Sequence, residues 1–263
     1  MIKQYSVLQE NIYNINKKRF LIRYLIKLYW IFSKKAWEDG HLNGAGQDGN
    51  RNWITILAII CADRTYIPPA IIYPLEASDI QPNWLQDYKP EQQPAFFTAS
   101  ENGWTNNEIG YEWLTTIFDR YTKRKASLNK EWRLLICDGH GSHLNMEFLD
   151  WCHKNKILVA VFPPHSTHRL QPLDVSLFSP LAKYYSRELD YHMAYSQGLV
   201  SVGKRHFWRF FWAAYNQAFT PDNIASGWKK TGIYPFNPDA VLGRLPKRTR
   251  KESPLPKTRL QTI

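Results

Sequence analysis

Two apolar runs with abrupt ends are the strongest constraint on how this chain folds. Residues 132–137 stop at Asp138-Gly139, and residues 157–162 stop at two prolines. Apolar runs of this length are typical of buried strands, and proline ends a strand because it cannot donate a hydrogen bond to a sheet. A helix predicted over residues 145–155 joins the runs, so the pattern predicts a β-α-β unit whose two strands are parallel.

Two aspartates follow these predicted elements at points where ligands often bind. Asp138 stands at the carboxyl end of its strand, which is the usual ligand edge of an α/β sheet. Asp174 opens a helix predicted to run to about residue 190, and 35 residues separate it from Asp138. The helix dipole favours a negative charge there. Each aspartate alone could simply cap a turn or a helix, but the pair suits a shared divalent metal.

The other predicted elements are a hairpin, a damaged first strand and several helices. Residues 53–62 and 67–73 form the hairpin around Asp63-Arg64. The first strand is expected over residues 11–15, and residues 76–94, rich in proline and glutamine, are expected to be irregular. Helices are expected over residues 108–123, with Thr105 or Asn106 as the cap, and near 174–190, 204–219 and 221–230.

Six motifs, taken in order, point to a known family. They read Ala45-Gly-Gln-Asp-Gly-Asn-Arg-Asn-Trp-Ile-Thr, Pro68-Pro-Ala-Ile-Ile-Tyr, Gly103-Trp-Thr-Asn-Asn-Glu, Cys137-Asp-Gly-His-Gly-Ser-His, Gln171-Pro-Leu-Asp and Gly227-Trp-Lys-Lys-Thr-Gly-Ile-Tyr-Pro-Phe-Asn-Pro. With these motifs the chain resembles, over roughly residues 9–243, the catalytic domain of the DDE superfamily of transposases, in the pogo/Tigger branch of the Tc1/mariner group.

This resemblance implies an α/β, ribonuclease-H-like fold, with a mixed sheet flanked by helices and a helical C-terminal part. It also implies three acidic residues that hold two Mg²⁺ or Mn²⁺ ions, which activate a water or a DNA 3′-hydroxyl for attack at phosphorus. Asp138 and Asp174 match the second and third acids, so they are the predicted catalytic metal ligands. His143 and Gln171 are candidates for contacts to those ligands or to phosphate. The implied partner is DNA, with a nuclear location, a possible homodimer and no small-molecule substrate.

The first acidic position departs from the family pattern. The aligned stretch reads Ile12-Tyr-Asn-Ile-Asn-Lys-Lys-Arg-Phe, so Asn16 stands where the family has its first catalytic aspartate and Lys17 replaces an acidic neighbour. An asparagine offers a carbonyl oxygen but no negative charge, and magnesium prefers carboxylate and water. We therefore expect the chain to bind DNA and to cut it poorly or not at all. The alternative is an active endonuclease and strand-transferase in which Asp39 or Asp48 takes the place of the missing acid.

The chain is expected to divide into three parts. Residues 1–35 are a basic, divergent remnant of the first strand, residues 36–243 are the DDE-type domain, and residues 244–263 are a disordered basic tail. Residues 21–32 are apolar but too short and too charged to span a membrane, and no cleavage site for a signal peptide follows them. They come either from a decayed or misassigned reading frame or from a new helix. No helix-turn-helix module is expected ahead of residue 11.

The net charge of +11 is concentrated at the two ends. Residues 1–35 hold eight Lys or Arg against one Glu, and residues 244–263 hold seven against one, so the body between them is close to neutral. DNA binding by the body then needs local basic groups that contact the phosphate backbone. The candidates are Lys123, Arg124, Lys125, Lys204, Arg205, Lys229 and Lys230, although each cluster could be an ordinary solvated face.

Other site chemistries are weaker interpretations of the sequence. Two H-x-x-H pairs, at 140–143 and 165–168, have no cysteine at a zinc-ligand spacing. Ser142 lacks the flanking glycines of a nucleophile elbow. The aromatic stretch 207–212 could stack bases, but its helical spacing predicts a stripe of the core. The three cysteines include no close pair, which indicates buried thiols in a reducing compartment.

Overall fold

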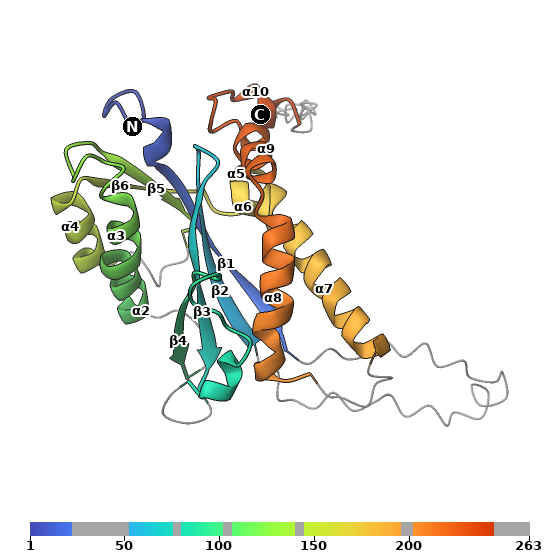
Figure 1. Ribbon diagram of the computed structural model, residues 1–263. Helices are drawn as coiled ribbons and strands as arrows, with labels where there is room; N and C mark the ends of the chain where they lie inside the picture. The colour runs from blue at the N-terminus through green and yellow to red at the C-terminus, as the bar shows by residue number, and fades with distance from the viewer. Residues whose placement is uncertain (23–52, 76–79, 102–106, 140–144, 196–201, 245–263) are drawn as a thin grey trace, which may run out of the picture.

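A six-stranded mixed sheet forms the centre of the computed structural model (Figure 1), which describes residues 1–22, 53–75, 80–101, 107–139, 145–195 and 202–244. The strands are β1 (Ile12–Leu21), β2 (Trp53–Cys61), β3 (Tyr66–Pro74), β4 (Phe96–Ser100), β5 (Arg133–Cys137) and β6 (Ile157–Val161). Their order is β4-β3-β2-β1-β5-β6, in which β2 runs antiparallel to both of its neighbours and the other pairs are parallel. The hairpin of β2 and β3 and the parallel pair of β5 and β6 confirm the predictions.

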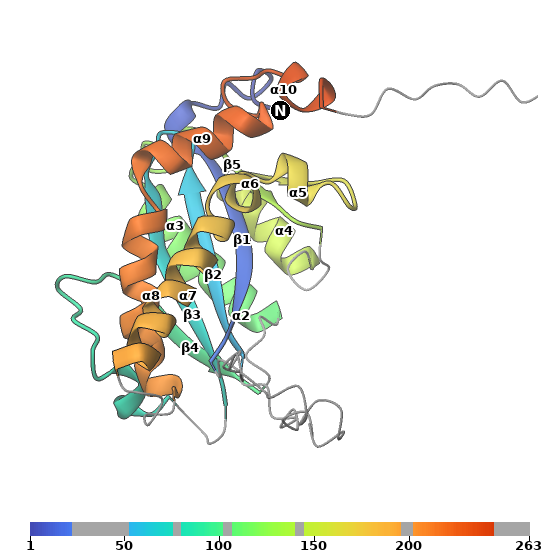
Figure 2. The ribbon, with the colours of Figure 1, turned by 90° about the vertical axis from the view of Figure 1, so that its right-hand side faces the viewer.

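Helices cover both faces of this sheet (Figure 2). One layer holds α4 (Met146–Lys154) and the continuous segment α2 (Asn107–Glu112), η3 (Trp113–Phe118) and α3 (Asp119–Thr122), in which η3 is π-helical. The other layer holds α5 (Thr167–Leu170), α6 (Pro172–Ser176), α7 (Phe178–Tyr195), α8 (Lys204–Ala218), α9 (Pro221–Thr231) and α10 (Asp239–Leu242). This confirms the ribonuclease-H-like α/β class and the helical C-terminal part.

The pleat of β1 divides its side chains between the two helical layers. Ile12 and Phe20 belong to the core on the side of α7 and α8, whereas Tyr13 and Ile15 belong to the core on the side of α2 to α4. Successive side chains of a strand point to opposite faces. As β1 is central and covered on both sides, it has apolar side chains at both even and odd positions, which explains why its sequence shows no simple alternation.

An aromatic stripe on α8 packs into the core between the sheet and α7. Phe207, Phe210, Phe211, Ala214 and Ala218 are all buried, and the rings of Phe207 and Phe211 stack with their centroids 5.5 Å apart. Residues three and four apart share one face of a helix. The core stripe predicted from the spacing is therefore confirmed, and these rings do not face a nucleic acid.

Two strands differ from the sequence-based expectation. β1 runs for ten residues rather than the five expected over 11–15, and it pairs with β2 from Tyr13 to Leu21. It is a complete central strand, because ladder hydrogen bonds form whatever the side chains, so the basic residues 17–19 do not end it. β4 was not predicted, since it is a short, half-buried edge strand without a clear pattern. The boundary at residue 35, Thr105, Asn106 and the basic tail beyond Arg244 lie outside the described residues.

The three cysteines are free and buried, as the sequence predicts. Burial raises the pKa of Cys61, Cys137 and Cys152 to about 12. Since the thiolate is the reactive form, these thiols act as apolar packing groups. The reducing compartment itself stays a prediction.

Candidate active site at the centre of the sheet

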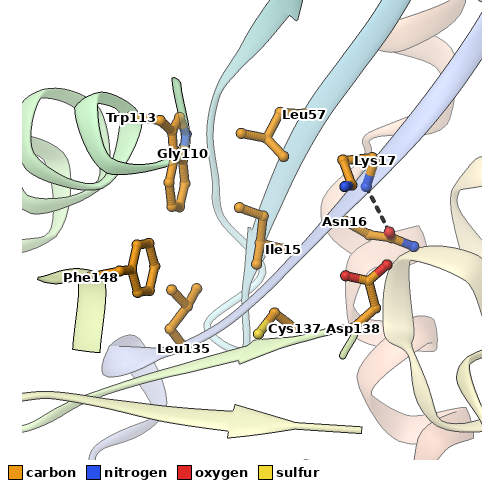
Figure 3. Close-up of a pocket in the computed structure, with 10 residues that line it drawn as sticks. All are labelled: Ile15, Asn16, Lys17, Leu57, Gly110, Trp113, Leu135, Cys137, Asp138 and Phe148. Carbon is orange, nitrogen blue, oxygen red and sulfur yellow. Dashed lines mark hydrogen bonds between the residues drawn. The ribbon is translucent and has the colours of Figure 1, made fainter. Parts of the chain in front are cut away.

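The three predicted catalytic positions lie together at the middle of the sheet. β1 and β5 are parallel neighbours in a register that pairs Asn14 with Ile136, so two residues later Asn16 and Asp138 lie side by side (Figure 3). Asp174, in the first turn of α6, completes the group, because the Asn16 Nδ2 donates a hydrogen bond to the Asp174 Oδ1 at 3.0 Å. The placement agrees with the predicted site, whose catalytic role stays a prediction.

A second asparagine on the same face of β1 fixes this arrangement. Asn14 is fully buried; its Nδ2 donates to the Ile136 carbonyl at 3.0 Å and its Oδ1 accepts from the Leu173 amide at 3.1 Å. One side chain thereby ties β1 to β5 and to the start of α6. Asn14 was not among the site residues predicted from the sequence. Its signal was a polar residue two positions before Asn16 in an otherwise apolar run.

Gln171 also ties the start of α6 to β1. Its side chain is fully buried, and its Nε2 donates to the Ile15 carbonyl at 3.0 Å. That bond anchors the residue just before α6 to β1, which sets the position of Asp174. Of the two interpretations open for Gln171, the geometry favours support of the acidic residues. His143, the other candidate, lies outside the described residues.

α9 supports α6 from behind through the motif that begins at Gly227. A Cβ added to Gly227 would lie 2.8 Å from the Pro172 carbonyl oxygen, which is closer than real Cβ contacts. Next to it, the buried Trp228 donates its Nε1 hydrogen to the Cys61 carbonyl at 3.0 Å. Only glycine at position 227 lets α6, the helix that carries Asp174, pack this closely against α9.

Gly227→Ala is expected to lower the free energy of unfolding by roughly 1–3 kcal/mol, since the contact atom is backbone and cannot rotate away. Alanine has a higher helix propensity than glycine by about 1 kcal/mol, so a net loss of stability would identify the close contact as its cause. The free energy of unfolding is measured by urea denaturation. Gly203→Ala is the matched control, because a Cβ there meets nothing within 4 Å. Equal stabilities of the two variants would contradict this account of the motif.

Each carboxylate of the site has a lysine near it. Lys17 lines the same pocket as Asn16 and Asp138; burial lowers the pKa of its ammonium group, and the negative charge of Asp138 opposes that shift. Burial and the nearby Asp138 raise the pKa of Asp174, while Lys18 and the Asn16 hydrogen bond lower it. Asp174 therefore holds its negative charge less readily than a free aspartate does. Two lysines balance the charge of two carboxylates before any metal binds.

The residues present do not fit a site for two divalent cations. The Asn16 Oδ1 accepts a hydrogen bond from the Lys17 amide at 2.6 Å, and its Nδ2 is turned toward Asp174, so neither end is directed as a metal ligand. In the part of the chain that the structure describes, no group of three or more His, Cys, Asp or Glu side chains could hold a metal. Asp138 and Asp174 are the remaining acidic donors, enough for weak binding of a hard cation.

The basic residues predicted to contact DNA differ in their exposure to solvent and in the ion pairs that they already form. The prediction for Lys204 is wrong: its side chain is buried, its Nζ donates to the Pro74 carbonyl at 2.8 Å, and the ammonium lies 4.2 Å from the centre of the Trp84 ring. Lys125 pairs with Asp63 at 2.5 Å and Lys123 lies 3.8 Å from Asp119. Arg124, Arg205, Lys229 and Lys230 are exposed.

Comparison with known proteins identifies the family. Residues 50–228 match the DDE superfamily endonuclease family. The chain belongs to this family. The matched segment of the DDE domain contains Asp138 and Asp174, but it begins after β1 and leaves Asn16 outside.

Two relatives of this DDE-family chain are much longer than it is. It is 35% identical over 245 residues to MFS-type transporter clz9 of Cochliobolus lunatus, which covers 93% of the chain and 25% of that protein. It is 28% identical over 125 residues to the pogo transposable element with ZNF domain of Homo sapiens, which covers 48% of the chain and 8% of that protein. The chain therefore spans a quarter or less of these relatives, and the second supports the expected relationship to pogo.

Solved structures similar in fold come from the Mos1 transposase. The pre-cleavage Mos1 transpososome is 12% identical with a TM-score of 0.45, covering 88% of the chain and 58% of Mos1. The Mos1 catalytic domain with raltegravir and Mn is 10% identical with a TM-score of 0.43, covering 90% and 88%. Among the described residues of the DDE-family chain, the helices are too short or too polar to cross a membrane.

Proposed function

We propose that this DDE-family chain is a transposon-derived domain that binds DNA and cleaves it poorly or not at all. The observation that supports the proposal is the hydrogen bond from the side-chain amide of Asn16 to the carboxylate of Asp174. Where the family has an acid that would repel Asp174 until a cation binds, this chain has a donor that satisfies Asp174 directly. The hydrogen bond between Asn16 and Asp174 stabilises the charged form of Asp174 without a metal, so a cation that binds there gains less free energy.

Divalent cations are proposed to bind weakly, through Asp138 and Asp174. Mos1 has been solved with Mn and with Mg, and carboxylate oxygens are the ligands that these hard ions prefer. Altering groups that only orient metal ligands typically costs about 10–100-fold in affinity or activity. Replacing a ligand carboxylate by Asn16 and its acidic neighbour by Lys17 is expected to cost more.

DNA is the proposed partner, and the nucleus the proposed location. Mos1 has been solved as a paired-end complex with a transposon end, and the present chain has exposed basic residues on several helices. Arg124 follows α3, Arg205 lies on α8, and Lys229 and Lys230 lie in the last turn of α9. Such residues bind the phosphate backbone without reading bases. A homodimer remains a further expectation, which sedimentation of the DNA complex would test.

The experiment is fluorescence anisotropy of a labelled duplex at several salt concentrations, in EDTA. The wild type is expected to bind with an affinity that falls steeply with salt. The double variant Lys229→Gln/Lys230→Gln should reduce the slope of log affinity against log salt by about 2, since each phosphate contact contributes about 0.9. Lys3→Gln/Lys154→Gln, which removes two exposed lysines elsewhere, is the control. Absence of salt-dependent binding by the wild type would refute the proposed function.

A further inference from the structure

A second concave site lies beside the acidic one, between two motifs that are far apart in the sequence. α5 and the segment from α9 to α10 lie next to each other at one end of the molecule (Figure 1 and Figure 2). Between them is a groove of about 670 Å³, here called the α5–α10 groove. One wall includes His165, His168, Arg169 and Leu170, and the other includes Thr231, Phe236 and Leu242.

The wall after α9 is a hydrogen-bonded loop that leaves Phe236 in solvent. Gly232 ends α9 in the left-handed conformation at φ 65°, and a Cβ there would lie 2.0 Å from the Asn237 carbonyl oxygen. The loop closes on itself through the Asn237 amide, which donates to the Gly232 carbonyl at 2.8 Å. Phe236, between these residues, is 78% exposed. Leu242, which lines the same groove, is 57% exposed, so the two side chains belong to one exposed apolar surface of the kind that marks a ligand-binding groove.

The charge of the groove favours an anionic ligand. Its lining includes Arg169 and two histidines and no Asp or Glu. Arg169 is exposed, and its Nε donates to the His168 Nε2 at 3.1 Å, which orients the guanidinium. The exposed Lys229 and Lys230 directly precede Thr231 of the opposite wall. An exposed arginine in the same groove as an exposed aromatic ring is a combination that binds single-stranded nucleic acid, with a phosphate on the cation and a base on the ring.

The groove is also close to the acidic site along the chain. Its first wall, α5, leads through Gln171 into α6, which carries Asp174. Leu170 of the groove and Asp174 are four residues apart, so at most about 14 Å of chain separates the two sites. Bases of an intact duplex are stacked inside the helix and cannot reach an aromatic ring on the protein surface. The site thus fits nucleotides that are already unpaired.

We propose that the α5–α10 groove binds unpaired nucleotides of a DNA strand next to the acidic site, with one base stacked on Phe236 and a phosphate on Arg169. The inference rests on the proposed function in taking DNA as the partner. It adds that the preferred substrate is a duplex with a single-stranded tail. It also gives a role to the motif after α9, beyond its support of α6.

The experiment compares a blunt duplex with the same duplex carrying a single-stranded tail, by fluorescence anisotropy in EDTA. Phe236→Ala is expected to weaken binding of the tailed DNA about 10-fold or more, since stacking one base on an aromatic ring contributes that much, and to leave the blunt duplex unchanged. Arg169→Gln should lower the salt slope by about 1 on the tailed DNA only. Tyr195→Ala, which removes a ring that is 83% exposed at the end of α7, should change neither.

The outcomes separate this inference from the function on which it rests. If the wild type binds the blunt duplex and Phe236→Ala weakens both DNAs equally or neither, the groove is not a site for unpaired nucleotides and DNA binding still stands. If Phe236→Ala instead changes self-association in sedimentation, the groove is a contact between copies and the inference is wrong. If the wild type binds neither DNA, the proposed function fails and the inference falls with it.

Discussion

Asn16→Asp is expected to raise Mg²⁺-dependent nicking of supercoiled plasmid by about 100-fold or more over the wild type, because a first ligand to a catalytic cation matters more than the groups that orient it. The change replaces the amide that now donates to Asp174 by a third carboxylate beside Asp138 and Asp174. Three carboxylates in one place repel each other until a cation binds. Adding Lys17→Glu, which restores the acidic neighbour, should increase the effect.

Two controls make this result specific. Asp138→Ala in the Asn16→Asp background should abolish nicking, which excludes a contaminating nuclease. The melting temperature of Asn16→Asp should be lower than that of the wild type in EDTA and should rise on addition of Mn²⁺, a readout independent of activity. Nicking by the wild type that Asp138→Ala removes would contradict the predicted impairment. Asp39 or Asp48, both outside the described residues, would then be the candidates for a substitute acid.

Arg133→Met is expected to cost roughly 3–5 kcal/mol of the free energy of unfolding, because it removes the buried partner of Asp119 and leaves this carboxylate only the partly exposed Lys123 at 3.8 Å. Arg133 opens β5 and is fully buried; its Nη1 lies 2.8 Å from the Asp119 Oδ1. The same guanidinium donates to the Thr122 hydroxyl at 2.7 Å, the Asn129 side chain at 2.7 Å and the Asn155 carbonyl at 2.8 Å. It therefore joins α3, the start of β5 and the end of α4.

Urea unfolding of Arg133→Met beside Lys125→Met measures the difference between a buried and an exposed ion pair. The pair of Lys125 and Asp63 is partly exposed, and such pairs contribute about 0–1 kcal/mol. The double variant Arg133→Met/Asp119→Leu should recover much of the loss, since removal of both charges leaves no unpaired carboxylate. A loss for Arg133→Met no larger than that for Lys125→Met would show that water reaches the site and that the network is not buried in solution.

Strands and helices with clear ends were predictable, and weakly patterned ones were not. β5, α4 and β6 follow from apolar runs with Asp-Gly and Pro-Pro stops, because such signals act over neighbouring residues. β4 has five half-buried residues at an edge and gives no such signal. β1 appeared damaged because Lys17, Lys18 and Arg19 are unusual in a central strand. The length of β1 was decided by its hydrogen bonds to β2, a strand that lies more than thirty residues further along the chain.

The site shows the same division between sequence and tertiary structure. The sequence by itself determined that two aspartates stand at a strand end and a helix start, and the resemblance to the family predicted that Asn16 occupies the position of its first acid. Only the tertiary structure decided that Asn16 donates to Asp174, that Asn14 and Gln171 hold α6 on β1, and that Lys204 is buried. It alone brought residues 165–170 and 231–242 together as a groove. The physical reason is that periodicity and chain-stopping residues act locally, whereas burial, pairing and side-chain direction depend on segments that the fold brings together from distant parts of the sequence.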